Sequence, residues 1–169
     1  MTAAEKLRAL AEDEDYRRKL ALCYQCGMCT GGCPVAHVKP DYNPRRMLES
    51  IILGQYDEVL SSDLLWLCTS CHSCLERCPQ MIEVSELLVH LKNLAAESGN
   101  VPKLLLERAK RIAETGQSTP VSKASLVWRE KLNLAPVSPV NIEEVQAILQ
   151  ATNFPGWLER ARSNNGSRI

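Results

Sequence analysis

The chain has 169 residues, 45% of them hydrophobic, which is enough for one compact core with an appendage. Its 20 Lys and Arg balance its 20 Asp and Glu. This argues against a nucleic-acid partner, because phosphate binding needs a basic face. No apolar stretch approaches the roughly 18 residues of a membrane span. The charged start "MTAAEKLRALAEDEDY" is neither a signal nor a transit peptide. We therefore expect a cytoplasmic protein whose thiols stay reduced.

Helical signals dominate the first half of the chain. Thr2 is placed to cap a first helix, and a second helical stretch surrounds "DYRRKLAL". Asn43 and Pro44 form an N-cap and N1 pair for a helix that ends near Gly54. The segment "SSDLLWLC" has a serine–aspartate start and an apolar turn that leads straight into Cys68.

A long amphipathic helix is predicted next. Its apolar residues recur at intervals of three and four: Val84, Leu87, Leu88, Leu91, Leu94 and Ala95. Gly99 is expected to end it, and a further helix from Pro102 is expected to bury Leu105, Ala109 and Ile112. No segment shows a convincing period of two, so the predicted fold class is all-α.

The composition changes from residue 117 onward. "QSTPVSKASL" and "LAPVSPVN" are rich in proline and serine and indicate connecting segments on either side of a short helix. Asn141 is placed to cap a last helix, whose apolar stripe is Ile142, Val145, Ile148 and Leu149. We therefore divide the chain into a domain at 1–116 and a proline-interrupted extension at 117–169. The extension either packs on the helical core or contacts a partner, and we expect a partner contact.

Eight cysteines fall in two runs, "CYQCGMCTGGCP" and "CTSCHSCLERCP". Both have the spacing C-x2-C-x2-C-x3-C-P, which is typical of bacterial ferredoxins with a 4Fe–4S cluster. A disulfide framework suits small secreted chains, and zinc sites are usually built from C-x-x-C pairs that need no third cysteine at this interval. Soft thiolates in this number favour two iron–sulfur clusters. The ligand candidates are Cys23, Cys26, Cys29, Cys33, Cys68, Cys71, Cys74 and Cys78.

The residues between the cysteines suit such loops. Three glycines are expected to take positive φ and to let the first loop approach its cluster: Gly27, Gly31 and Gly32. Pro34 and Pro79 should steer the chain away from each loop after the fourth cysteine. His72 lies inside the second loop, where it is either an exposed loop residue or a titrating charge beside a cluster.

No residues in the sequence form a convincing catalytic constellation. There is no nucleophile elbow, no Walker loop and no G-x-G-x-x-G motif, and "CTGGCP" belongs to a cluster loop. We expect no catalytic residue in this chain, and therefore a protein that moves electrons while a partner breaks bonds.

Two such motifs about 45 residues apart resemble the family of C-type subunits of heterodisulfide reductases. The residues that carry the resemblance are "CYQCGMCTGGCP", "NPRRMLESIILGQ", "SSDLLWLCTSCHSCLERCPQMIEVSELLVHLKNLA" and "AETGQSTPV", within roughly residues 16 to 135. The family is similar in fold to the α-helical ferredoxin domain of succinate dehydrogenase iron–sulfur subunits. The resemblance therefore implies an α-helical ferredoxin domain with two 4Fe–4S clusters, to which the pattern after residue 116 adds a C-terminal helical extension.

The resemblance also implies a function and partners. The chain would relay electrons between two partners, a flavin-containing A-type subunit on one side and a B-type subunit on the other. The B-type subunit has its own cysteine-rich catalytic cluster site, which acts on a disulfide or sulfur substrate. The chain would then be a non-catalytic subunit of an oxidoreductase complex. Two alternatives stay open, a stand-alone two-cluster ferredoxin-like carrier and a structural zinc protein.

The fourth cysteine of each run need not serve its own cluster. In two-cluster ferredoxins it ligates the other one. Extending that rule predicts that Cys78 completes the first cluster and Cys33 the second. The first cluster would be held by Cys23, Cys26, Cys29 and Cys78, and the second by Cys68, Cys71, Cys74 and Cys33. The alternative is that each run holds its own cluster.

Overall fold

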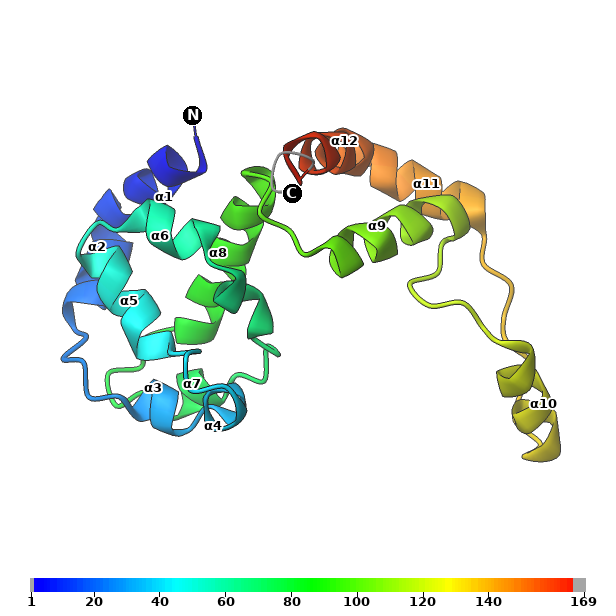
Figure 1. Cartoon of the computed structure of the whole chain (residues 1–169), viewed down its shortest axis with the longest axis horizontal. Coiled ribbons are helices and arrows are strands. Elements are labelled where there is room, and N and C mark those ends of the chain that lie inside the picture. Colours follow the sequence, from blue (N-terminus) through cyan, green and yellow to red (C-terminus); the bar gives the residue numbers. More distant parts are fainter. Residues whose placement is uncertain (1, 166–169) are drawn as a thin grey trace.

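The computed structural model describes residues 2–165. Within them the chain forms twelve α-helices and one 3-10 helix, and no strand (Figure 1). The predicted all-α class is confirmed. None of the helices in this part of the chain is both long and apolar enough to cross a membrane.

Five helices enclose the main core. They are α1 (Ala3–Glu12), α2 (Glu14–Ala21), α5 (Pro44–Ile52), α6 (Tyr56–Ser61) and α8 (Val84–Glu97). The most buried side chains of this core include Leu7, Leu48, Ile51, Leu88 and Leu91. The apolar face predicted for α8 is confirmed, because Val84, Leu87, Leu88, Leu91, Leu94 and Ala95 are all buried.

The helix ends predicted at Thr2, Asn43 and Gly99 are confirmed. The Thr2 hydroxyl accepts the Glu5 backbone N–H at 3.1 Å and the Glu5 carboxylate accepts that of Thr2 at 2.8 Å, a reciprocal capping box. The Asn43 side chain accepts the Arg46 N–H at 3.1 Å, with Pro44 at the first helical position. Gly99 follows α8 with φ +86°.

Four short helices carry the two cysteine runs. The first run contains α3 (Met28–Gly31) and ends at α4 (Pro34–Val38), while η1 (Asp63–Leu67) leads into the second run, which contains α7 (Ser73–Glu76). Helices α3 and α7 contact each other at one end of the helical body (Figure 1). The fold therefore brings the two runs side by side.

A second, smaller core lies beside the first. It is formed by α9 (Lys103–Thr115), α11 (Ile142–Ala151) and α12 (Phe154–Asn165), which contact one another, and α12 also contacts α8. Its buried residues are Val101, Leu106, Ala109, Leu158 and Ala161. Helix α9 thus shares its core with the C-terminal helices, and the division at residue 116 remains a prediction.

The inward faces of α9 and α11 differ in part from those predicted. Leu105 is 37% exposed and Leu106 is buried in its place, because α9 turns the side with Leu106 and Ala109 toward α12. Ile148 is 63% exposed, whereas Ile142, Val145 and Leu149 are partly buried. The predicted Asn141 cap is present, with its side chain accepting the Glu144 N–H at 3.4 Å.

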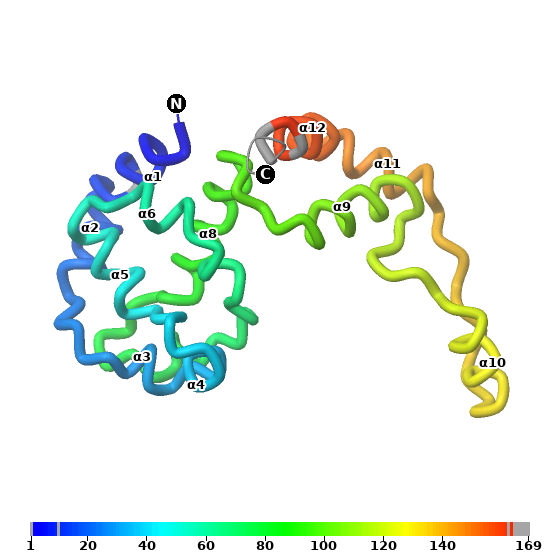
Figure 2. Tube along the Cα trace, viewed as in Figure 1, coloured from blue at the N-terminus to red at the C-terminus, as the bar shows by residue number. Residues whose placement is uncertain are grey.

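Helix α10 (Lys123–Lys131) lies apart from both cores. Two extended segments run side by side to it and back, so that α10 projects at the far end of the molecule (Figures 1 and 2). It buries no residue, and Leu126, Val127 and Trp128 are about half exposed or more. The Arg129 guanidinium donates to the Ala135 carbonyl and ties the returning segment to the helix.

Candidate iron–sulfur cluster sites

The two cysteine runs share one backbone conformation. Gln25 and Ser70, each just before the second cysteine of its run, have φ of +59° and +54°. Gly27 and His72, each just after that cysteine, have φ of +81° and +61°. Left-handed residues that alternate with ordinary ones turn successive N–H groups toward the same side, which creates a concave site for an anion. Both loops are therefore shaped to surround a negatively charged group.

The expectation of positive φ holds for one of the three glycines. Gly31 lies within α3, and Gly32 ends that helix with φ −94°. At Gly32 a Cβ would meet the side chain of Arg77 from the second run, which would have to move to make room. The close contact between Gly32 and Arg77 joins the two loops directly.

Cys33, the last cysteine of the first run, lies with the cysteines of the second. It lines one cavity together with Cys68, Cys71 and Cys74. Cys33 is 8% exposed and Cys74 9% exposed, so this group of four sulfurs is shielded from water on its inner side. Four soft thiolate donors around one cavity form a donor set that suits an iron–sulfur cluster.

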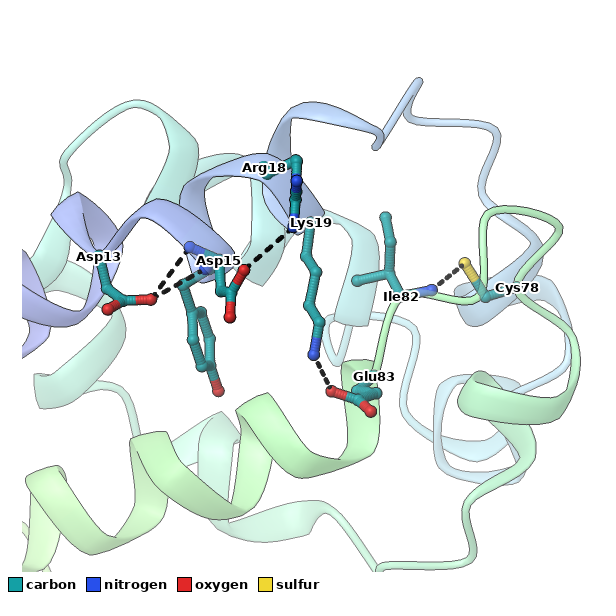
Figure 3. Close-up of polar contacts among 8 residues, drawn as sticks. Asp13, Asp15, Arg18, Lys19, Cys78, Ile82 and Glu83 are labelled. Atoms are coloured by element: carbon teal, nitrogen blue, oxygen red, sulfur yellow. Dashed lines mark hydrogen bonds and ion pairs between the residues drawn. The ribbon is translucent and has the colours of Figure 1, made fainter.

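Cys78, the last cysteine of the second run, lies toward the first. Desolvation raises the pKa of the Tyr24 phenol, and the charges of both Cys26 and Cys78 raise it further. Lys19, one helical turn before the first run, donates to the Glu83 carboxylate beyond Cys78 at 2.7 Å (Figure 3). This ion pair holds the chain after Cys78 against the helix that enters the first run.

Hydrogen-bond donors lie beside the sulfurs of Cys78 and Cys23. The Ile82 backbone N–H donates to Cys78 Sγ at 3.3 Å (Figure 3), and Gln25 Nε2 donates to Cys23 Sγ at 3.3 Å. Arg45 Nη1 in turn donates to Gln25 Oε1 at 3.0 Å and brings a cation close to this loop. Such donors stabilise the negative charge of an iron–sulfur cluster.

Polar contacts also surround the second group of cysteines, which consists of Cys33, Cys68, Cys71 and Cys74. Lys92 on α8 donates to the Cys68 carbonyl at 2.7 Å, and the Ser73 hydroxyl lies 3.5 Å from Cys71 Sγ. His72 Nδ1 lies 3.1 Å from the hydroxyl of Ser85, which is 2% exposed. His72 is thus tied to α8, although about half of its side chain faces solvent.

The cysteine thiols differ in acidity with their surroundings. Burial, followed by the charge of Cys68, raises the pKa of Cys74 to about 11, and burial also raises the pKa of Cys29. The hydrogen bond between Cys71 and Ser73 lowers the pKa of the exposed Cys71. Cys29 lies in α3 and Cys74 in α7, and these two helices contact each other.

Three neighbours of the cysteines were missed in the sequence. Tyr42, Lys92 and Ser85 reach the second group from the turn before α5 and from α8. The only sequence signal for Tyr42 is its position before the Asn43–Pro44 cap, and Lys92 carries none.

Among residues 2–165, no three His, Cys, Asp or Glu side chains are arranged to hold a single metal ion.

Comparison with known proteins identifies the clusters. Residues 19–82 match the family described as 4Fe-4S dicluster domain, and this stretch contains all eight cysteines. The chain therefore carries two 4Fe–4S clusters, as predicted.

Whole-chain relatives identify the family. The chain is 35% identical to the C-type iron–sulfur subunit 2 of the CoB–CoM heterodisulfide reductase of Methanocaldococcus jannaschii, over 83% of this chain and 78% of that protein. It is 37% identical to the C2-type subunit of the H(2)/formate:CoB–CoM heterodisulfide,ferredoxin reductase of Methanococcus maripaludis, over 80% and 76%. A third relative, an Archaeoglobus profundus protein described as similar to the C-type heterodisulfide reductase subunit, is 29% identical over 90% and 84%. The chain belongs to the family of C-type iron–sulfur subunits of heterodisulfide reductases.

Proposed function

We propose that this protein relays single electrons between two partner subunits, of which one contains flavin and the other is cysteine-rich and acts on a disulfide or sulfur substrate. The observation that carries this proposal is the contact of α3 with α7, which brings the two cysteine runs next to each other at one end of the body. When bound, the clusters supply one-electron acceptance and release. The residues of the chain hold them close together, as a relay requires.

We further propose that the ligands are crossed between the two runs. The shared cavity of Cys33 with Cys68, Cys71 and Cys74 supports this assignment for the second cluster. The influence of Cys78 on Tyr24 and the Lys19–Glu83 ion pair support Cys78 as the fourth ligand of the first cluster. Crossed ligands would lock the two loops together, so that cluster assembly becomes part of folding.

The projecting helix α10 is the proposed partner contact within the extension at 117–169. Its Leu126, Val127 and Trp128 are exposed on a segment that neither core covers. Trp and apolar residues clustered on a protruding element are typical of protein interfaces. The relatives are named as subunits of reductases that act on a CoB–CoM heterodisulfide. For this chain we propose the broader class of disulfide or sulfur substrates.

The partner proposal is tested by tagging the chain in its own host and purifying it anaerobically at native expression levels. We expect it to copurify with a flavoprotein and with a larger cysteine-rich subunit, in constant proportion through gel filtration. A stable, fully clustered monomer would instead favour the stand-alone carrier. The cytoplasmic location predicted from the sequence stays a prediction, and fractionation of the same host extract tests it.

The relay proposal is tested by comparing the isolated chain with the complex. With its clusters fully ligated by cysteines, the isolated chain offers no site at which a disulfide could bind. We expect it to accept electrons from dithionite but to reduce no disulfide, while the complex turns over. Turnover by the pure chain would contradict a relay role.

A further inference from the structure

Tyr42 is a buried phenol at the second group of cysteines. Its side chain is 1% exposed, and it lines the cavity with Cys33, Cys68, Cys71 and Cys74. The turn between α4 and α5 holds it there, since its backbone N–H donates to the Lys39 carbonyl at 2.9 Å and Asn43 and Pro44 begin α5 directly after it. Its position is therefore fixed by the backbone on both sides.

The side chain of Tyr42 shares its cavity with four cysteine side chains. A buried phenol normally finds a hydrogen-bond acceptor, and the sulfur of Cys68 lines the same cavity. Burial, the hydrogen bond with Cys68 and the negative charges of Cys68, Cys33 and Cys74 all raise the pKa of Tyr42. A phenol is protonated at neutral pH, so Tyr42 can donate to a thiolate in this cavity.

We propose that Tyr42 is a positioning residue that donates a hydrogen bond to the cluster-bound sulfur of Cys68 and thereby raises the reduction potential of the second cluster. Reduction adds one negative charge to the cluster and its sulfurs, so an O–H···S bond stabilises the reduced form more than the oxidised form. The low dielectric of the buried site strengthens this difference. Cys68 ligates the second cluster in both the crossed and the uncrossed arrangement, so this proposal does not depend on that choice.

The first cysteine run contains a tyrosine, Tyr24, that can be compared with Tyr42. Tyr24 lies two residues before Cys26 in the first run, but it is 59% exposed. Water can replace an exposed hydroxyl at the sulfur, whereas water could reach the position of the Tyr42 hydroxyl only if the core opened. The same chemical group should therefore matter at the second cluster and matter little at the first.

The test is Tyr42→Phe in the complete complex, with Tyr24→Phe as the matched control. Anaerobic potentiometric titration followed by electron paramagnetic resonance measures the potential of each cluster. We expect Tyr42→Phe to lower the reduction equilibrium constant of the second cluster by about tenfold, which is about 59 mV for one electron. The first cluster should keep its potential, and Tyr24→Phe should change both clusters much less.

A second substitution keeps the proposal testable if Tyr42→Phe fails to fold. Tyr42→3-fluorotyrosine retains the packing and is a stronger hydrogen-bond donor, so it should raise the potential of the second cluster. An unchanged second cluster in either variant at full iron content would overturn the proposal. Equal shifts of both clusters would also overturn it, because they would indicate a general loosening of the loops.

Discussion

Lys92 Nζ donates a hydrogen bond of 2.7 Å to the backbone carbonyl of Cys68, although the two residues lie on different elements, α8 and the start of the second cysteine run. The contact is partly buried, so solvent screens the ammonium charge less than at the surface. A positive charge at this place favours the more negative, reduced state of the cluster that Cys68 binds.

We expect Lys92→Gln to lower the potential of the second cluster by a few tens of millivolts, roughly half of the tenfold step of about 59 mV. The amide of glutamine retains a donor for the carbonyl, so mainly the charge is lost. Lys6→Gln is the control, because Lys6 pairs with Glu97 on the other side of the body. Equal shifts in the two variants would mean that overall charge, and not this contact, sets the potential.

Crossed ligation predicts opposite damage from two similar substitutions. Cys78→Ser should impair the first cluster, for instance by leaving a three-iron form, while the second keeps four sulfur ligands. Cys33→Ser should impair the second cluster and spare the first. Mössbauer and electron paramagnetic resonance spectra of the two variants distinguish the clusters.

The uncrossed arrangement makes the reverse prediction for both variants. Damage to the second cluster in Cys78→Ser, matched by damage to the first in Cys33→Ser, would show that each run serves its own cluster. If one variant loses both clusters, the other variant and the remaining iron content still distinguish the crossed from the uncrossed arrangement. The shared cavity supports the crossed outcome, because Cys33 lines it together with Cys68, Cys71 and Cys74.

The sequence was sufficient for features that depend on local spacing. The two cysteine runs, the capping box at Thr2 and the Asn43–Pro44 helix start are all short-range patterns, and the structure contains them. The apolar face of α8 was predictable for the same reason, because its residues follow the helical period. The number and kind of clusters followed from the spacing of the cysteines alone.

Features that depend on packing were not predictable in this way. Lys92 and Tyr42 reach Cys68 only because α8 and the turn before α5 pack beside the second run. Gly32 was expected to need positive φ, but it has φ −94° and instead lies against the side chain of Arg77, which is distant in sequence. Long-range contacts of this kind leave no periodic signal.

Helix α12 was missed for a different reason. Pro155 and Gly156 disfavour a helix interior, yet both lie in the first turn of the helix, where proline is tolerated. The helix is stabilised by tertiary contacts, since Leu158 and Ala161 are buried against α9 and the rings of Phe154 and Trp157 lie 5.2 Å apart. Packing outweighed the local propensity.

Asn100→Ala is expected to destabilise the fold by about 1–3 kcal/mol. The Asn100 side chain is buried and donates to the Leu60 carbonyl at 2.8 Å, just before the segment that leads to Cys68. Without it that carbonyl loses a buried partner. Anaerobic thermal denaturation measures the effect, with the exposed Asn93→Ala as the control. A midpoint as high as that of the control would contradict a structural role for Asn100.

Thiol reactivity should follow the pKa differences in the cluster-free chain. Cys71 has a lowered pKa through its hydrogen bond with Ser73, so it forms thiolate at lower pH than an ordinary cysteine. Cys74, with its pKa raised to about 11, should stay protonated and react slowly until the pH approaches that value. Timed alkylation by iodoacetamide and mass spectrometry across pH 6–9, a range set by the ordinary thiol pKa of about 8.5, measures both rates.

Ser73→Ala is the matched control for that experiment. Removal of the hydroxyl should raise the pKa of Cys71 and slow its alkylation near neutral pH, while Cys74 stays slow. Equal rates at Cys71 and Cys74 in the unmodified chain would show that these environments form only when the clusters are bound.

Trp128→Ala should weaken assembly without affecting the clusters. Trp128 is 61% exposed on α10, and the Lys131 ammonium lies 5.1 Å from its ring centre, a cation–π contact on the surface of the helix. Because no core surrounds Trp128, its removal should leave folding and iron content unchanged.

If α10 inserts into a partner, a buried Trp is a common centre of binding energy, and its loss should weaken binding at least tenfold, or about 1.4 kcal/mol. Titration of the purified partner subunits measures this affinity, and Glu130→Ala on the same helix is the control. Equal affinity of the Trp128 variant and the control would remove α10 from the interface and leave the relay function itself untouched.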